Sequence, residues 1–173
     1  MMESHTISVL VENKFGVLAR ISGLFSGRGF NIDSLTVSPT NDKTLSRMTI
    51  VTHGDDAVLE QVEKQLNRLV EVVKVTDLTG SGFVSRELML VKVSTVGAVT
   101  GEIIQMATVF KGNVVNVEHD SLVIEVTGPT EKCDAFVELM KGFGIIELAR
   151  TGRVALARTS QTTEMIDQLV ATE

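Results

Sequence analysis

The chain has 173 residues, of which 43% are hydrophobic and 22% charged, and it carries a net charge of −6. This composition is that of a folded globular protein, and the length accommodates one ordinary domain or two small ones. The negative charge argues against nucleic acid as a partner, because binding to the phosphate backbone depends on Lys and Arg. The sequence also lacks Trp and Tyr, which are well suited to base stacking.

The sequence shows none of the features of a secreted or membrane-spanning protein. It has no run of about 18 apolar residues, so we expect no transmembrane helix and no membrane partner. The amino terminus, MMESHTISVL, leads directly into a strand pattern without a basic or apolar leader. Cys133 is the only cysteine, which excludes an internal disulfide and favours a reducing compartment. We therefore predict a cytoplasmic protein.

The first half of the chain predicts the element order β-α-β-β-α-β. Apolar and polar residues alternate at the start, as in a half-buried strand. An amphipathic helix follows and stops at Gly29, a residue suited to the left-handed position after a helix. Asp55 and Asp56 mark the start of the second helix. The expected elements are strand 6–12, helix 16–29, strands 32–39 and 45–53, a helix from residue 55, and strand 70–78.

After a flexible linker, Thr79–Gly82, the same order repeats. Both halves are therefore predicted to be α+β, ferredoxin-like βαββαβ domains in tandem, with antiparallel sheets and helices on one face. The last strand is expected to bend at Gly152. The predicted domains are residues 1–79 and 83–158, followed by a tail at 159–173 that either frays or forms a short helix. The expected elements of the second domain are strand 88–95, helix 98–111, strands 114–117 and 122–126, a helix from residue 130, and strand 145–157.

The segment Glu12–Ile32 carries the strongest functional signal. A polar turn leads to Gly16 at the start of a helix, and Asn31 begins the returning strand. Because the first turn of a helix has unpaired N–H groups and a partial positive charge, it can bind a carboxylate. The amides of Asn13 and Asn31 offer donors and acceptors for a zwitterion, and apolar neighbours can receive a branched side chain. The candidate effector-binding residues are Asn13, Gly16, Val17, Leu18, Asn31 and Ile32.

No other group of residues predicts chemistry, so we expect no catalytic residue and no metal site. The histidines lack metal-ligand spacing; His5 and His119 are expected to be solvated, and His53 to end a strand. Cys133 is interpreted as a core residue on a predicted helix. The glycines of the first helix lie within it rather than before it, unlike a phosphate-binding loop. Four arginines are open between solvation and subunit docking: Arg20, Arg28, Arg47 and Arg86.

Five segments of the sequence carry a resemblance to a known family. They are SVLVENKFGVLARISGLFSGRGFNIDSLTV (8–37), LSRMTI (45–50), LEQVEKQLNRLVEVVKV (59–75), RELMLVKV (86–93) and IIELARTGRVALAR (145–158). The chain resembles the ACT-domain family, small ferredoxin-like modules that bind amino acids. Within it, the chain is most similar to the regulatory (small) subunits of acetohydroxyacid synthase, also called acetolactate synthase.

The resemblance implies a non-catalytic subunit of branched-chain amino-acid biosynthesis. Such a subunit activates a separate catalytic subunit and makes it sensitive to feedback inhibition by valine; the preference among valine, leucine and isoleucine is left open. Thiamine diphosphate, magnesium and FAD are expected on the catalytic partner, and no cofactor on this chain. In the family, effector sites lie between the N-terminal domains of a homodimer. One chain would supply the turn and helix start around Asn13 and Gly16, and its partner would supply Asn31 and Ile32.

Three other classes of function remain open from the residues alone. A stand-alone ACT-type sensor, regulating another enzyme or a transcription factor, would bind the ligand without activating the synthase. An enzyme would need a convergent acid, base or metal cluster, which the sequence does not show. A structural scaffold would bind no small molecule.

Overall fold

The computed structural model describes residues 3–79, 82–97 and 99–158. The predicted tail and residues 80–81 of the predicted linker lie outside the described residues. No helix in the described part of the chain has the length and apolar character needed to cross a bilayer.

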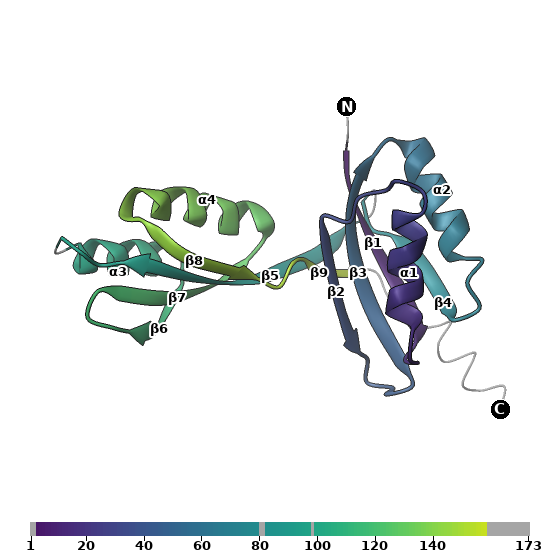
Figure 1. The fold of residues 1–173 in the computed structure, drawn as a ribbon, viewed down its shortest axis with the longest axis horizontal. Coiled ribbons are helices and arrows are strands. Elements are labelled where there is room, and N and C mark those ends of the chain that lie inside the picture. The colour runs from purple at the N-terminus through teal and green to yellow at the C-terminus, as the bar shows by residue number, and fades with distance from the viewer. Residues whose placement is uncertain (1–2, 80–81, 98, 159–173) are drawn as a thin grey trace. The chain divides into compact units, whose positions relative to one another are not determined.

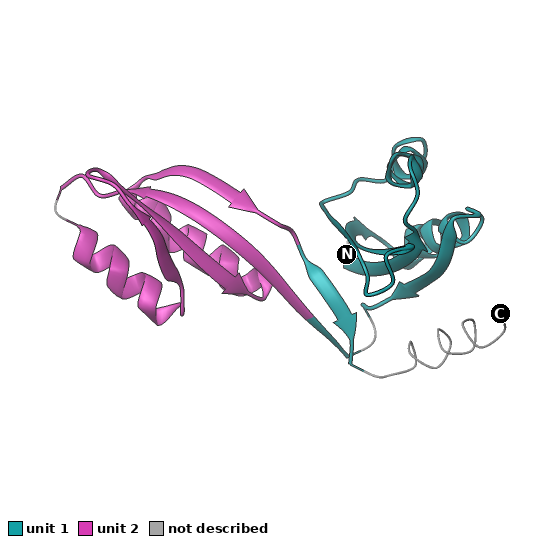
Figure 2. Cartoon of the chain, turned by 90° about the horizontal axis from the view of Figure 1, so that it is seen from below, with its two compact units in different colours: residues 1–84, 153–173 teal, residues 85–152 magenta. Residues whose placement is uncertain are grey.

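The chain divides into two compact units (Figure 2). The first unit consists of residues 1–84 together with residues 153–173, and the second consists of residues 85–152. Residues 153–158, which the sequence assigned to the second domain, therefore belong to the first unit.

The first unit has the predicted βαββαβ order, with both helices on one face of an antiparallel sheet (Figure 1). The strand order in the sheet is β2-β3-β1-β4. The side chains of β1 that alternate toward the helices, such as Ile7 and Val9, are fully buried. The prediction of a half-buried strand is wrong, because Thr6, Ser8 and Leu10 on the other face of β1 are buried too. The elements are β1 (Glu3–Glu12), α1 (Val17–Ser26), β2 (Ser34–Pro39), β3 (Leu45–Gly54), α2 (Asp56–Leu66) and β4 (Val72–Asp77).

The ends of both helices in this unit follow from local sequence. Helix α1 ends at Ser26, and the chain continues in a turn to Gly29, which has the predicted left-handed backbone (φ 72°). The N–H of Phe30 donates to the carbonyl of Phe25 at 3.1 Å, which closes a Schellman motif. Helix α2 begins after Asp55, whose side chain accepts from the N–H of Val58 at 2.9 Å. The predicted acidic cap is thus confirmed.

The second unit repeats the order, and its sheet has the strand order β6-β7-β5-β8. In its core, the rings of Phe110 and Phe136 pack edge to face, with centroids 5.2 Å apart. Cys133 is fully buried in this core, and burial raises the pKa of its thiol. The elements are β5 (Phe83–Ser94), α3 (Thr100–Val109), β6 (Asn113–Val117), β7 (Ser121–Gly128), α4 (Thr130–Met140), η1 (Lys141–Phe143) and β8 (Ile145–Arg150).

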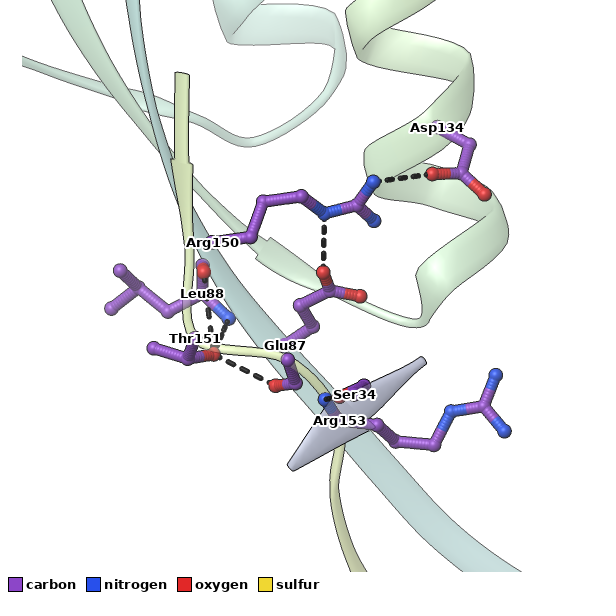
Figure 3. A network of polar contacts seen from close by, with 8 residues as sticks. Ser34, Glu87, Leu88, Asp134, Arg150, Thr151 and Arg153 are labelled. Atoms are coloured by element: carbon purple, nitrogen blue, oxygen red, sulfur yellow. Dashed lines mark hydrogen bonds and ion pairs between the residues drawn. The ribbon is translucent and has the colours of Figure 1, made fainter. Parts of the chain in front are cut away.

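A three-residue ion network ties α4 to the sheet of the second unit (Figure 3). Arg150 on β8 pairs with Glu87 on β5, and its second nitrogen donates to Asp134 on α4 at 2.7 Å. Glu87 is buried, so Arg150 supplies the opposite charge that a buried carboxylate requires. The hydrogen bond to Glu87 raises the pKa of Arg150 above its ordinary value.

The predicted strand 145–157 is two strands in the structure. Gly152 has a left-handed backbone (φ 83°), so the expected bend is present, but it separates β8 from a further strand, β9 (Val154–Ala157). The segment around β9 lies on the first unit's sheet. Thr36 donates to the carbonyl of Arg153 at 3.0 Å. Ser34 accepts from the N–H of Arg153 at 3.1 Å (Figure 3).

The hydroxyl groups that hold this segment lie on the sheet face opposite the helices. Thr6 and Thr49 alternate with core residues of β1 and β3, so their side chains point away from α1 and α2. Thr6 accepts from the Arg153 guanidinium at 2.6 Å, and Thr49 accepts from the N–H of Ala155 at 3.4 Å. Residues 153–155 therefore cover a sheet face that the sequence leaves open.

Candidate functional site

A cavity of about 270 Å³ lies in the first unit where β1 passes through the turn into α1. Its size is that of a site for a small molecule rather than a polymer. Part of its wall comes from the predicted segment, and the rest comes from β2 and β3. The lining residues are Val11, Glu12, Asn13, Lys14, Val17, Leu18, Val37, Ser38, Pro39, Ser46 and Met48.

Gly16 sets the direction in which the helix leaves this cavity. It is the N-cap residue of α1, with φ 84° and ψ −10°, and an added Cβ would meet no atom within 4 Å. The conformation rather than crowding therefore favours glycine, because L-residues are strained in this region. No side chain in the described part of the chain caps the helix. Among the described residues, the N–H groups of Leu18 and Ala19 have no acceptor, so the helix start offers free donors beside the cavity.

The polar residues at the rim of the cavity are bonded to other residues of the same chain. Asn13 donates from its side-chain amide to the carbonyl of Lys43 at 2.9 Å, and its backbone N–H donates to Thr44 at 2.6 Å. The side-chain amide nitrogen of Asn13 therefore already has an acceptor within the first unit. Lys14 pairs with Glu12 at 2.8 Å, and the hydrogen bond between them raises the pKa of the lysine.

The apolar part of the cavity has a buried floor and an open rim. Val17 and Met48 are buried, whereas Leu18 and Val37 are 41% and 43% exposed. Phe15, in the adjoining turn, is fully exposed. Exposed apolar side chains gathered around a recess mark a surface that a ligand or a partner can cover.

Asn31 and Ile32 lie at the other end of the first unit. The carbonyl of Asn31 accepts from Thr52 at 2.6 Å, whereas Asn13 is bonded to Thr44, eight residues earlier near the opposite end of β3. At about 3.4 Å per residue along a strand, the two asparagines are separated by roughly 25 Å. One chain therefore does not present both to a single small ligand. Ile32 is partly buried and packs on the core.

Several lining residues were missed from the sequence. Ser46 and Met48 belong to the segment LSRMTI, which supported the resemblance but received no role in the site. Val37 is three residues beyond Ser34, where β2 begins. Predicting them would require the pairing of β2 with β3, which places Val37 opposite Met48. That pairing depends on register rather than on any local motif.

The other chemical candidates fall into ordinary structural roles. His5 was expected to be solvated, but this is wrong: it is buried, and its ring contacts the carbonyl of Gly54 at 3.2 Å, because β1 and β3 pair along their whole length. His119 is exposed and His53 ends β3, as predicted. The described residues contain no group of three His, Cys, Asp or Glu side chains able to hold a metal ion.

The four arginines that the sequence left open between solvation and subunit docking each have a partner within their own unit. Arg20 pairs with Glu71 at 2.5 Å. Arg28 donates to Gln65 at 2.8 Å, Arg47 donates to Ser8 at 3.0 Å, and Arg86 donates to the carbonyl of Ser85 at 2.6 Å.

Tandem ferredoxin-like units, the first with a cavity at a helix start, define a protein with the fold of the ACT class. Two family models match the chain: the acetohydroxyacid synthase small subunit-like ACT domain over residues 7–74, and the small subunit of acetolactate synthase over residues 86–159. The chain is 56% identical over 154 residues to a probable acetolactate synthase small subunit of Archaeoglobus fulgidus, covering 89% of this chain and 96% of the relative. It is 49% identical over 158 residues to the acetolactate synthase small subunit of Aquifex aeolicus, covering 91% and 82%.

A solved structure agrees with these sequence relatives. The crystal structure of the acetolactate synthase small subunit from Thermotoga maritima has a TM-score of 0.84 and 41% identity to this chain, and the match covers 91% of this chain and 99% of that one. The chain therefore belongs to the acetolactate synthase small-subunit family.

Proposed function

We propose that this chain is the regulatory subunit of an acetolactate synthase, that it activates the catalytic subunit, and that it confers feedback inhibition by valine. The observation that carries the proposal is the cavity beside the uncapped start of α1, in the part of the chain that matches the ACT-domain model. In this role the chain performs no chemistry. Thiamine diphosphate, magnesium and FAD would be bound by the catalytic subunit, in the cytoplasm.

The site suits a small aliphatic amino acid. The free N–H groups of Leu18 and Ala19 can donate to the carboxylate, and the helix dipole favours a negative charge there. The apolar floor at Val17 and Met48 can receive a branched side chain. Charge-assisted hydrogen bonds contribute about 1.5–3 kcal/mol each, enough for micromolar to millimolar binding after the cost of association.

A second copy of the chain would complete the site. Asn31 and Ile32 lie roughly 25 Å from Asn13 along β3, so they can reach this ligand only from another molecule. The exposed apolar groups of Phe15, Leu18 and Val37 provide a surface for a symmetric partner. We therefore propose a homodimer through the N-terminal units, with the effector bridging the two chains.

The test is acetolactate production by the cognate catalytic subunit, measured with and without this chain across a valine titration. Activation that valine then reverses supports both parts of the proposal. The absence of activation, with valine binding still seen by calorimetry, would instead identify a stand-alone sensor. The absence of both would leave a scaffold.

A further inference from the structure

Asn31 is the first member of a chain of three polar side chains in the first unit. Its amide nitrogen donates to one carboxylate oxygen of Asp33 at 2.7 Å. The other oxygen of Asp33 contacts Nδ1 of His53, at the end of β3. The side chains of His53 and Asp33 are 49% and 32% exposed, so the network lies at the surface.

The backbone around Asn31 is held independently of this network. Thr52, which is fully buried, donates from its hydroxyl to the carbonyl of Asn31 at 2.6 Å. The N–H of Asp33 donates to the carbonyl of Val51 at 2.9 Å. Because β3 fixes the main chain on both sides of residue 32, the Asp33 carboxylate is not needed to place Asn31. It determines how the Asn31 side chain is turned.

The carboxylate selects one of the two orientations of the amide. An asparagine amide has a donor end and an acceptor end, and a carboxylate only accepts. The NH2 group of Asn31 therefore faces Asp33, whereas the reversed amide would bring two oxygens together. His53 holds the far oxygen of Asp33 and fixes the carboxylate in turn. The carbonyl oxygen of Asn31 is thereby directed away from Asp33.

We propose that Asp33 and His53 are positioning residues of the effector site: they turn the Asn31 amide so that its carbonyl oxygen receives the ammonium group of the bound amino acid. This inference rests on the proposed function. The two ends of the zwitterion are then divided between two chains. The start of α1 in one chain takes the carboxylate, and Asn31 of the other takes the ammonium group. Asp33 would thus favour ligands that carry an ammonium group at the position that Asn31 contacts.

The experiment compares L-valine with isovalerate, in which a hydrogen replaces the ammonium group, by titration calorimetry on the full-length chain. Asp33→Ala is expected to raise the Kd for valine about tenfold and to leave the Kd for isovalerate, which has no donor for the Asn31 carbonyl oxygen, nearly unchanged. His53→Ala is expected to act in the same direction by a smaller factor. Asp33→Glu, which keeps the carboxylate, is expected to restore the preference for valine, and Asp33→Ala is expected to add no further loss to Asn31→Ala.

Two control variants separate this effect from a general disturbance. Glu60→Ala removes an exposed ion pair with Lys64 on α2, and His119→Ala removes an exposed histidine from the second unit. Both are expected to bind the two ligands like the wild type.

The outcomes that overturn the inference differ from those that overturn the proposed function. If Asp33→Ala weakens both ligands equally, or neither, while Asn31→Ala still weakens valine binding, the positioning role is wrong and the site assignment stands. If Asn31→Ala binds valine like the wild type, the assignment of Asn31 is wrong, and the positioning role falls with it. If the wild-type chain does not bind valine, the proposed function fails first.

Discussion

Two substitutions at Gly16 separate the stability of the helix start from its proposed role in binding. Gly16→Ala places an L-residue at φ 84°, which costs about 1–2 kcal/mol in this region, and no steric clash adds to it. Gly16→Asp suffers less, because aspartate tolerates the left-handed region better than alanine does. Its carboxylate can also accept from the free N–H groups of Leu18 or Ala19, and a side-chain cap contributes about 1 kcal/mol.

The two properties are therefore expected to rank the variants in different orders. The free energy of unfolding should fall from wild type to Gly16→Asp to Gly16→Ala, with each protein still folded, since domains are typically stable by about 5–15 kcal/mol. The response to valine should instead be kept in Gly16→Ala and weakened in Gly16→Asp, whose carboxylate would occupy the donors proposed to bind the ligand. Losing one charge-assisted hydrogen bond predicts a shift of about 10- to 100-fold in the valine concentration for half-inhibition.

Urea denaturation of the isolated chain measures the first ranking, and valine inhibition of the reconstituted synthase measures the second. If valine inhibits the Gly16→Asp complex at the same concentrations as the Gly16→Ala complex, the helix start does not bind the effector carboxylate. Equal stability of the two variants would show that the residue at position 16 does not cap α1.

Three further substitutions test the packing and electrostatics of the two units. Phe136→Ala should lower the free energy of unfolding of the second unit by about 3–5 kcal/mol, because the ring is fully buried; calorimetric scanning measures this, and a loss below 1 kcal/mol would contradict the core assignment. Thr36→Val, which keeps the shape but removes the donor to Arg153, should cost about 1 kcal/mol in urea denaturation, whereas an unchanged midpoint would show that the segment after Gly152 does not depend on that bond. Burial and neighbouring carboxylates raise the pKa of Glu63, so its charged form opposes folding at pH values above those at which glutamate ordinarily titrates. Glu63→Gln should therefore stabilise the chain at pH 7 and have no effect near pH 3, where the carboxyl group is neutral in both states. Glu60→Gln is the matched control with the opposite sign, since the Lys64 pair lowers the pKa of Glu60, and equal effects of the two changes at pH 7 would refute the reasoning.

The elements and their ends were determined by the sequence itself. The alternation in β1, the cap at Asp55 and the left-handed Gly29 are local properties, because dihedral preferences and capping bonds involve residues only a few positions apart. The same is true of the helix start after Gly16, and therefore of the part of the candidate site that lies on one continuous segment.

Only the tertiary structure decided the contacts between distant segments. The register of β1 against β3 buries His5, which its local sequence leaves in a polar context, and the pairing of β2 with β3 brings Val37 beside Met48 at the cavity. Arg153 reaches the hydroxyl groups of the first unit's sheet from more than 100 residues away, as the bond to Thr36 shows. A strand pattern specifies which side chains share a face, but not which strand or segment will cover that face, because that choice depends on the register and packing of the whole sheet.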